Sequence, residues 1–89
     1  MDVFFAASPA SHSRLGLVVP KHGYTIVERN RLKRRLREIG RRQVLPRLDG
    51  AGMHVDVLIR ASRRAYDARF DTLSAEVREA VEGLCSEGF

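Results

Sequence analysis

The tetrapeptide Thr25-Ile26-Val27-Glu28 restricts the possible folds of this chain more than any other segment. In this capping-box pattern, a threonine hydroxyl and a glutamate carboxylate three residues later satisfy each other's free backbone amides at the start of a helix. We therefore predict a helix from this point to about Val44. It should extend little past Pro46, because proline lacks the backbone donor that a helix interior needs.

Strands are predicted on both sides of this helix. The segments Val3–Ala7 and Arg14–Val19 are largely apolar, and Pro20 should close the second one. After the helix and a loop at residues 49–52, the β-branched residues of His54–Ala61 predict a third strand.

A second helix completes the predicted order of elements. Asp71 or Thr72 can cap it, and an apolar stripe then recurs at helical spacing at Leu73, Val77, Ala80, Val81 and Leu84. The order β-β-α-β-α contains a strand-helix-strand unit, which favours parallel strands joined by a crossover helix. Because 89 residues bury only one modest core, we expect a single α+β domain over residues 1–89, a small two-layer α/β sandwich.

Positive charge is concentrated in the first predicted helix. Residues 29–42 hold eight arginines and lysines against Glu38, a local charge of +7, so the rest of the chain contributes −2 to the total of +5. A solvated helix face normally mixes both signs, whereas a cluster of cations is typical of a polyphosphate partner. The charge therefore favours a nucleic-acid partner over a merely solvated face.

The basic helix has distinct faces when its residues are placed at 100° intervals. Leu32, Leu36 and Ile39 share one face, which should pack against the sheet. The opposite face carries Asn30, Lys33, Arg34, Arg37 and Arg41, and a flank beside Glu38 carries Arg31, Arg35 and Arg42. Arginine suits a nucleic acid because its planar fork can bond two phosphate oxygens or stack on a base, while an asparagine amide can contact a base edge or a sugar hydroxyl.

Two segments that occur in order carry a family resemblance. The strand Arg14-Leu15-Gly16-Leu17-Val18-Val19-Pro20-Lys21, followed by residues 27–38 with Arg29-Asn30-Arg31 and Lys33-Arg34, resembles the bacterial ribonuclease P protein subunit. The match is specific because strand, spacing and helix motif occur together, and it continues more weakly through the third strand and the last helix. It implies an α/β sandwich with a left-handed crossover, a large catalytic RNA as partner, and 5′ maturation of precursor tRNA as the reaction.

The resemblance also implies site residues. The positions that match the RNA-contacting residues of the family are Arg29, Asn30, Arg31, Lys33, Arg34 and Arg37, with Lys21 at the end of the second strand, and Arg41 lies on the same outward face. Family members usually open with a further helix that supplies aromatic residues to a cleft for the 5′ leader of the precursor tRNA, whereas this chain begins at the first strand. The candidates for that cleft are therefore Phe4 and Phe5, one on each face of the strand, with Arg60 and Arg63. Arg64 is an equal candidate for the basic residue of this cleft.

Two other classes of protein remain as alternatives. An enzyme acting alone would rely on His12, His22 and His54 for acid–base chemistry, but their spacing brings no two together. The histidines and the single cysteine, Cys85, lack a metal-ligand pattern. A ribosomal or other structural RNA-binding protein fits the composition equally well, and only the ordered motif argues against it.

We therefore expect a non-catalytic subunit of an RNA-based endoribonuclease, with no cofactor of its own and magnesium in the RNA-containing holoenzyme. No apolar run is long enough to cross a membrane, and no basic leader precedes the apolar start of the chain. A lone cysteine fits a reducing compartment. The expected location is the cytoplasm, without a membrane partner.

Overall fold

The computed structural model describes residues 1–87, which form a three-stranded mixed sheet and a layer of helices. The strands are β1 (Asp2–Ala7), β2 (Arg14–Val18) and β3 (Val55–Arg60), and the helices are α1 (Ile26–Ile39), α2 (Leu45–Gly50) and α3 (Phe70–Glu87). The sheet order is β1-β3-β2. The central strand β3 pairs antiparallel with β1 and parallel with β2, so the predicted α+β class and parallel crossover are confirmed.

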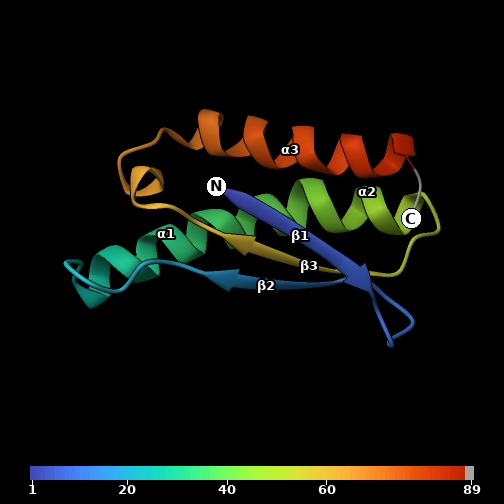
Figure 1. Ribbon diagram of the computed structural model, residues 1–89, viewed down its shortest axis with the longest axis horizontal. Helices are drawn as coiled ribbons and strands as arrows, with labels where there is room; N and C mark the ends of the chain where they lie inside the picture. The colour runs from blue at the N-terminus through green and yellow to red at the C-terminus, as the bar shows by residue number, and fades with distance from the viewer. Residues whose placement is uncertain (88–89) are drawn as a thin grey trace.

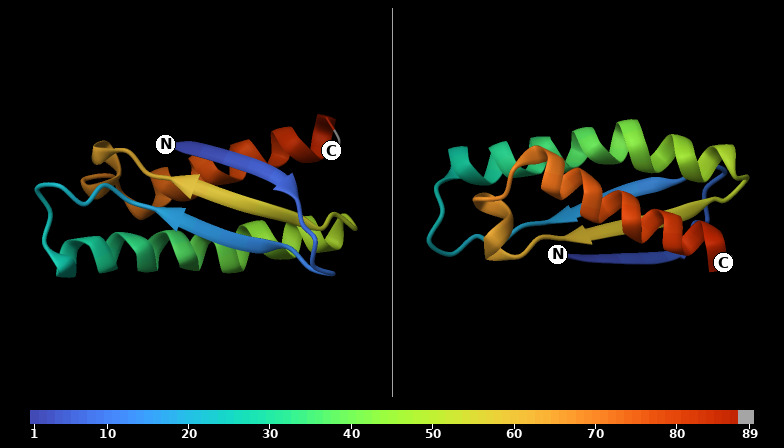
Figure 2. Two further views of the ribbon diagram at one scale, coloured as in Figure 1. Left: turned by 60° about the horizontal axis from the view of Figure 1, so that its bottom comes forward. Right: turned by 90° about the horizontal axis from the view of Figure 1, so that it is seen from above.

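The helices cover one face of the sheet and leave the other face open (Figure 1). The right-hand view of Figure 2 looks onto the helical side, where α3 lies in front of the sheet and α1 runs along β2. In that view the chain passes from β2 through α1 to β3 in the left-handed sense. This agrees with the expectation from the family resemblance and differs from the usual right-handed crossover.

Strand alternation places the core between the two layers. Every second residue of β3 is buried toward the helices, namely Val55, Val57 and Ile59. They pack with Leu32, Leu36 and Ile39 of α1 and with Leu73, Val77 and Val81 of α3. The apolar stripes predicted for both helices are therefore confirmed, because each buries its helix against this single core.

The start of α1 has the predicted capping box. The Thr25 hydroxyl accepts a hydrogen bond from the Glu28 backbone amide at 3.1 Å, and the Glu28 carboxylate accepts one from the Thr25 amide at 2.9 Å. These two bonds fix the first turn of the helix without any tertiary contact.

The end of the first helical run differs from the prediction. Helical structure continues from α1 through a π-helical segment, Gly40–Val44, into α2, so Pro46 does not end it. In the π segment the Leu45 amide bonds to the Gly40 carbonyl, which shifts the hydrogen-bond register by one residue. Pro46 then occupies the first turn of α2, where a helix needs no backbone donor.

Smaller differences concern the element ends. Strand β2 stops at Val18, one residue before the predicted end, and β3 is shorter than predicted by one residue at each end. Helix α3 begins at Phe70, and the Leu73 amide bonds to the carbonyl of Arg69, so Asp71 lies in the first turn and does not cap it. Part of the predicted loop at 49–52 is the last turn of α2, and a short 3-10 turn, η2 (Arg63–Tyr66), links β3 to α3.

Candidate nucleic-acid interface

The surface of α1 presents its cations as three parallel rows. Asn30, Arg34 and Arg37 are exposed on the crest of the helix, away from the sheet, and Arg37 also borders the row toward β2. One side row, toward β2, includes Lys33, and the other, toward η2, includes Arg31 and Arg35. The three rows together give a phosphate backbone several parallel tracks along one helix.

The row toward β2 lines a groove. Lys33, Arg37 and Arg41 face a hollow of about 420 Å³ whose remaining walls are Leu15, Leu17 and Leu45. The lining thus combines three apolar side chains with three cations, so the groove suits a group with an apolar face and a negative edge.

The row toward η2 borders a smaller hollow, of about 100 Å³. Arg31 and Arg35 line it with Tyr24 and Tyr66, together with Leu32, Glu28 and Asp67. The Tyr24 and Tyr66 rings are stacked, with centroids 3.6 Å apart and planes 7° from parallel. Arg63 lies over the other face of Tyr24, its guanidinium carbon 5.5 Å from the ring centroid.

Glu38 neutralises the carboxyl-terminal end of the basic surface. Its carboxylate lies 3.1 Å from the Arg41 guanidinium and also pairs with Arg42. The predicted outward position of Arg41 is correct, since its side chain is exposed, but its charge is shared with an acid. Arg34 and Arg37 are exposed and form no ion pair within residues 1–87, so their charges, like that of the exposed Arg31, are available to a phosphate.

The remaining predicted RNA-binding residues lie at the amino-terminal end of α1. Lys21 is exposed in the turn after β2, where its carbonyl accepts a hydrogen bond from the Tyr24 amide at 3.3 Å. Arg29 is half-buried, and its Nε is a buried donor without a hydrogen-bond partner among the described residues.

The open face of the sheet holds one of the two predicted aromatic residues. Phe4 is 46% exposed there, next to the exposed Leu58. Phe5 points to the opposite face and packs partly buried against the core. The Arg60 guanidinium lies over the Phe4 ring at 5.3 Å, whereas Arg63 is directed to Tyr24. The structure therefore brings Phe4 and Arg60 together and directs Arg63 elsewhere, while Phe5 packs toward the core and also lines a hollow beside Phe4.

Two ion pairs frame this open face. Arg14 bonds to Asp56 at 2.6 and 2.8 Å, and Arg60 bonds to Asp2 at 2.7 Å. Hydrogen bonds from the arginines hold the pKa of both carboxyls below its usual value of 3.8. Beside the Arg14–Asp56 pair lies a mostly apolar hollow of about 510 Å³, whose lining includes Phe4, Gly16 and Leu58. Its mostly apolar lining suits a planar group such as a nucleobase.

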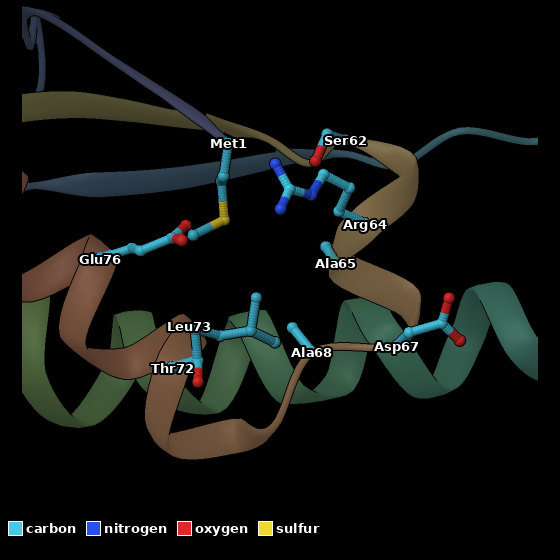
Figure 3. A pocket seen from close by; sticks show the side chains of 9 residues that line it. All are labelled: Met1, Ser62, Arg64, Ala65, Asp67, Ala68, Thr72, Leu73 and Glu76. Carbon is cyan, nitrogen blue, oxygen red and sulfur yellow. The ribbon is translucent and has the colours of Figure 1, made fainter.

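A fourth hollow contains Arg64 and no other predicted site residue. Figure 3 shows Met1, Arg64 and Glu76 directed into a space of about 450 Å³ between the start of β1, η2 and the start of α3. Asp67 and Glu76 place negative charge on its wall, which disfavours a phosphate. The position of Arg64 here separates it from Arg60, so the two arginines do not share a site.

The histidines are dispersed and exposed. His12 and His54 precede the starts of the parallel strands β2 and β3, whereas His22 follows the end of β2 and so lies at the opposite end of the sheet. Within residues 1–87 no group of three or more histidine, cysteine and acidic side chains could hold a metal ion. In the same part of the chain, no helix combines the length and apolar character that a membrane span requires.

Sequence reasoning missed the stacked tyrosines. Tyr24 and Tyr66 are 42 positions apart, in a turn and in a 3-10 segment, and no local pattern pairs them. It also missed the cross-strand pair of Arg14 and Asp56, which depends on the register of β2 against β3.

Comparison with known proteins agrees with this arrangement of a basic crossover helix on a three-stranded sheet. The family model for ribonuclease P matches residues 2–85. This chain belongs to the ribonuclease P protein family. A ribonuclease P protein component from Kocuria rhizophila is 39% identical over 74 residues, which are 83% of this chain and 62% of that protein. One from Thermus scotoductus is 40% identical, again over 83% of this chain but 41% of its own length. The chain thus spans between about two fifths and three fifths of these relatives.

Solved structures of the family share the fold. The ribonuclease P protein from Thermotoga maritima, in complex with 1-(4-fluorophenyl)-2-thiourea, superimposes with a TM-score of 0.69 at 26% identity, covering 89% of this chain and 74% of that one. The Staphylococcus aureus ribonuclease P protein gives a TM-score of 0.66 at 24% identity, covering 92% and 71%.

Proposed function

We propose that this chain acts as the protein subunit of ribonuclease P and binds the catalytic RNA through α1. The observation that carries the proposal is the exposed crest of α1, where Arg34 and Arg37 have no acidic partner within residues 1–87. Phosphate contacts of this kind position an RNA, and the amide of Asn30 beside them can read a base edge or a 2′-hydroxyl. Arg29, Arg31, Lys33, Arg41 and Lys21 complete the proposed RNA-binding surface.

The second part of the proposal concerns the precursor tRNA. The open sheet face presents the Phe4 ring and the Arg60 guanidinium next to an apolar hollow. An aromatic ring and a cation together are the usual means of holding an unpaired nucleotide. We assign this face to the single-stranded 5′ leader, with Phe5 supporting the strand from the core side.

The protein contributes binding and not the chemical step. His22 lies at the opposite end of the sheet from His12 and His54, and all three side chains are exposed, which disfavours a desolvated acid and base. Cleavage in this proposal belongs to the RNA, with magnesium bound in the RNA-containing holoenzyme, in the cytoplasm. The family match favours this function over the alternative of a ribosomal RNA-binding protein.

Multiple-turnover cleavage of a precursor tRNA tests whether the RNA performs the cleavage and the protein assists binding. The protein alone should not cut, and the protein together with a bacterial ribonuclease P RNA should cut at lower magnesium and salt concentrations than the RNA alone. RNA-free cleavage that survives nuclease treatment and disappears in His54→Ala would overturn the proposal, as would a mixture no better than the RNA alone.

Leader binding is tested separately with two phenylalanine variants. Phe4→Leu should weaken binding of a precursor tRNA about five- to hundredfold, because stacking contributes roughly 1–3 kcal/mol per base. Binding of mature tRNA, which lacks the leader, should be unchanged. Phe5→Leu is the matched control, since it should lower stability and leave the preference for precursor intact. If Phe4→Leu lost affinity equally for precursor and mature tRNA, the leader would not bind to this face.

A further inference from the structure

We propose that Tyr24 is a stacking site for an unpaired nucleobase of the bound RNA, with Arg63 as its movable cover. This inference rests on the proposed RNA-binding function and adds a site at the η2 side of α1, away from the open sheet face. It begins with the position of Tyr24, which lies in the turn immediately before the capping box of α1.

The inner face of Tyr24 is held rigidly. Its ring stacks on Tyr66 with centroids 3.6 Å apart and planes 7° from parallel. Tyr66 is itself fixed, because its hydroxyl donates a hydrogen bond to the Pro20 carbonyl at 2.5 Å. A ring that is anchored in this way loses little conformational freedom when a base stacks on it, so more of the stacking energy remains for binding.

The outer face of Tyr24 is covered loosely. The guanidinium carbon of Arg63 is 5.5 Å from the ring centroid, well beyond the stacking distance on the inner face. A base between the ring and the guanidinium needs about 7 Å, which is two contacts of about 3.5 Å. The guanidinium would therefore need to withdraw by only about 1.5 Å.

Nothing in the described part of the chain ties Arg63 down. Its side chain is exposed and takes part in none of the ion pairs within residues 1–87. It extends over Gly23, whose backbone has a φ of 85°, and a Cβ there would lie 3.6 Å from the Arg63 Nη1. A planar cation that can move onto the far side of a base would complete a tyrosine-base-arginine sandwich.

The surrounding charges favour a nucleotide over an uncharged ring. Arg31 and Arg35 line the hollow next to Tyr24, and Lys21 is exposed in the same turn. Two acids, Glu28 and Asp67, line the hollow as well and balance these two arginines, so the net positive charge around Tyr24 comes from Lys21 and Arg63 beside it. Because Arg31 and Arg35 share this hollow with Tyr24, a phosphate bound by them would bring its nucleotide close to the ring.

Tyrosine fluorescence tests the proposal directly. The chain has two tyrosines and no tryptophan, so its intrinsic emission comes from this stack alone. The Tyr66→Phe variant keeps an aromatic ring in the stack, without the hydroxyl bond to Pro20, and makes Tyr24 the single fluorophore. The probes are a labelled short single-stranded RNA of mixed sequence and an abasic ribose-phosphate chain of equal length, with binding followed independently by anisotropy of the label.

The RNA should quench the Tyr24 emission in step with binding, whereas the abasic chain should bind through its phosphates without quenching. In Tyr24→Phe, where Tyr66 is the single fluorophore, quenching should be clearly weaker because the inner ring remains covered. Tyr24→Leu should lower RNA affinity about five- to hundredfold with an unchanged salt dependence, and Tyr24→Phe should bind like the unaltered protein.

The outcomes separate the two proposals. RNA that binds by anisotropy without quenching Tyr24 overturns the stacking site and leaves the proposed function standing. If neither the RNA nor the abasic chain binds, both the stacking site and the proposed RNA-binding function are overturned. A weaker salt dependence of RNA binding in Tyr24→Leu would show that the substitution disturbed the basic helix. In that case the stacking site would be judged only by the quenching of Tyr24 emission in the Tyr66→Phe variant.

Discussion

The guanidinium of Arg41 lies 3.1 Å from the carboxylate of Glu38, one turn earlier on the same helix. Arg42 pairs with the same carboxylate, so one acid forms ion pairs with two of the eight cations in residues 29–42. The pairing divides the basic surface into a free amino-terminal part and a partly neutralised carboxyl-terminal part.

Replacing this acid should therefore strengthen RNA binding. Glu38→Gln releases Arg41 and Arg42, and each new phosphate contact adds about 0.7–0.9 unit to the slope of log affinity against log salt. The slope should steepen by up to about 1.8 units, and Arg34→Ala should flatten it by about 0.7–0.9. Glu79→Gln, on the exposed side of α3, is the control and should change neither. Filter binding at several salt concentrations measures all three, and an unchanged slope in Glu38→Gln would place the RNA elsewhere.

The core side of α1 should contribute stability and not binding. Leu36 is fully buried, so Leu36→Ala should lower the free energy of unfolding by about 2–4 kcal/mol through lost burial and a cavity. Arg37→Ala, one residue later on the exposed crest, should leave stability within about 0.5 kcal/mol. Chemical denaturation of both variants provides the measurement. Equal losses would show that the helix packs by a different face.

Two helical glycines should respond oppositely to alanine. A methyl group at Gly40 would overlap the side chain of Leu15, with the Leu15 Cγ only 3.3 Å away, so Gly40→Ala should destabilise the fold by about 1–3 kcal/mol. At Gly83 in α3 the same methyl group meets nothing within 4 Å in the described structure. Gly83→Ala should stabilise by about 0.5–1 kcal/mol through helix propensity. Thermal melting of the pair tests this, and a gain in both would mean that the packing of α1 on β2 is looser than described.

Acid should weaken the open face of the sheet. The hydrogen bonds from Arg14 hold the pKa of Asp56 below 3.8 in the folded state, so folding favours the ionised carboxylate. Its contribution to stability is complete above that value and is lost as the pH falls through the lower, folded-state pKa. Asp56→Asn should therefore be less stable than the unaltered protein at neutral pH and should lose less stability on acidification. Denaturation at neutral and acidic pH compares the two, and identical pH profiles would exclude this pair as a source of acid sensitivity.

Local sequence signals determined much of the fold. The capping box fixed the start of α1 because Thr25 and Glu28 need only each other's amides. The apolar stripes also identified the buried faces of α1 and α3, since helical periodicity brings residues such as Leu36 to one side wherever the helix lies. The sequence likewise located the basic surface, because charge density within one helix is independent of its neighbours.

Tertiary structure decided the rest, where the outcome depends on residues distant in sequence. Pro46 is compatible with a continuous helical run because the π segment shifts the backbone hydrogen bonds, and packing of Gly40 against Leu15 accompanies that shift. Tyr24 meets Tyr66 only because the crossover brings the turn before α1 beside η2. Helix and strand periods act over a few residues, whereas such pairings require the whole chain to close around one core, and no local pattern encodes them.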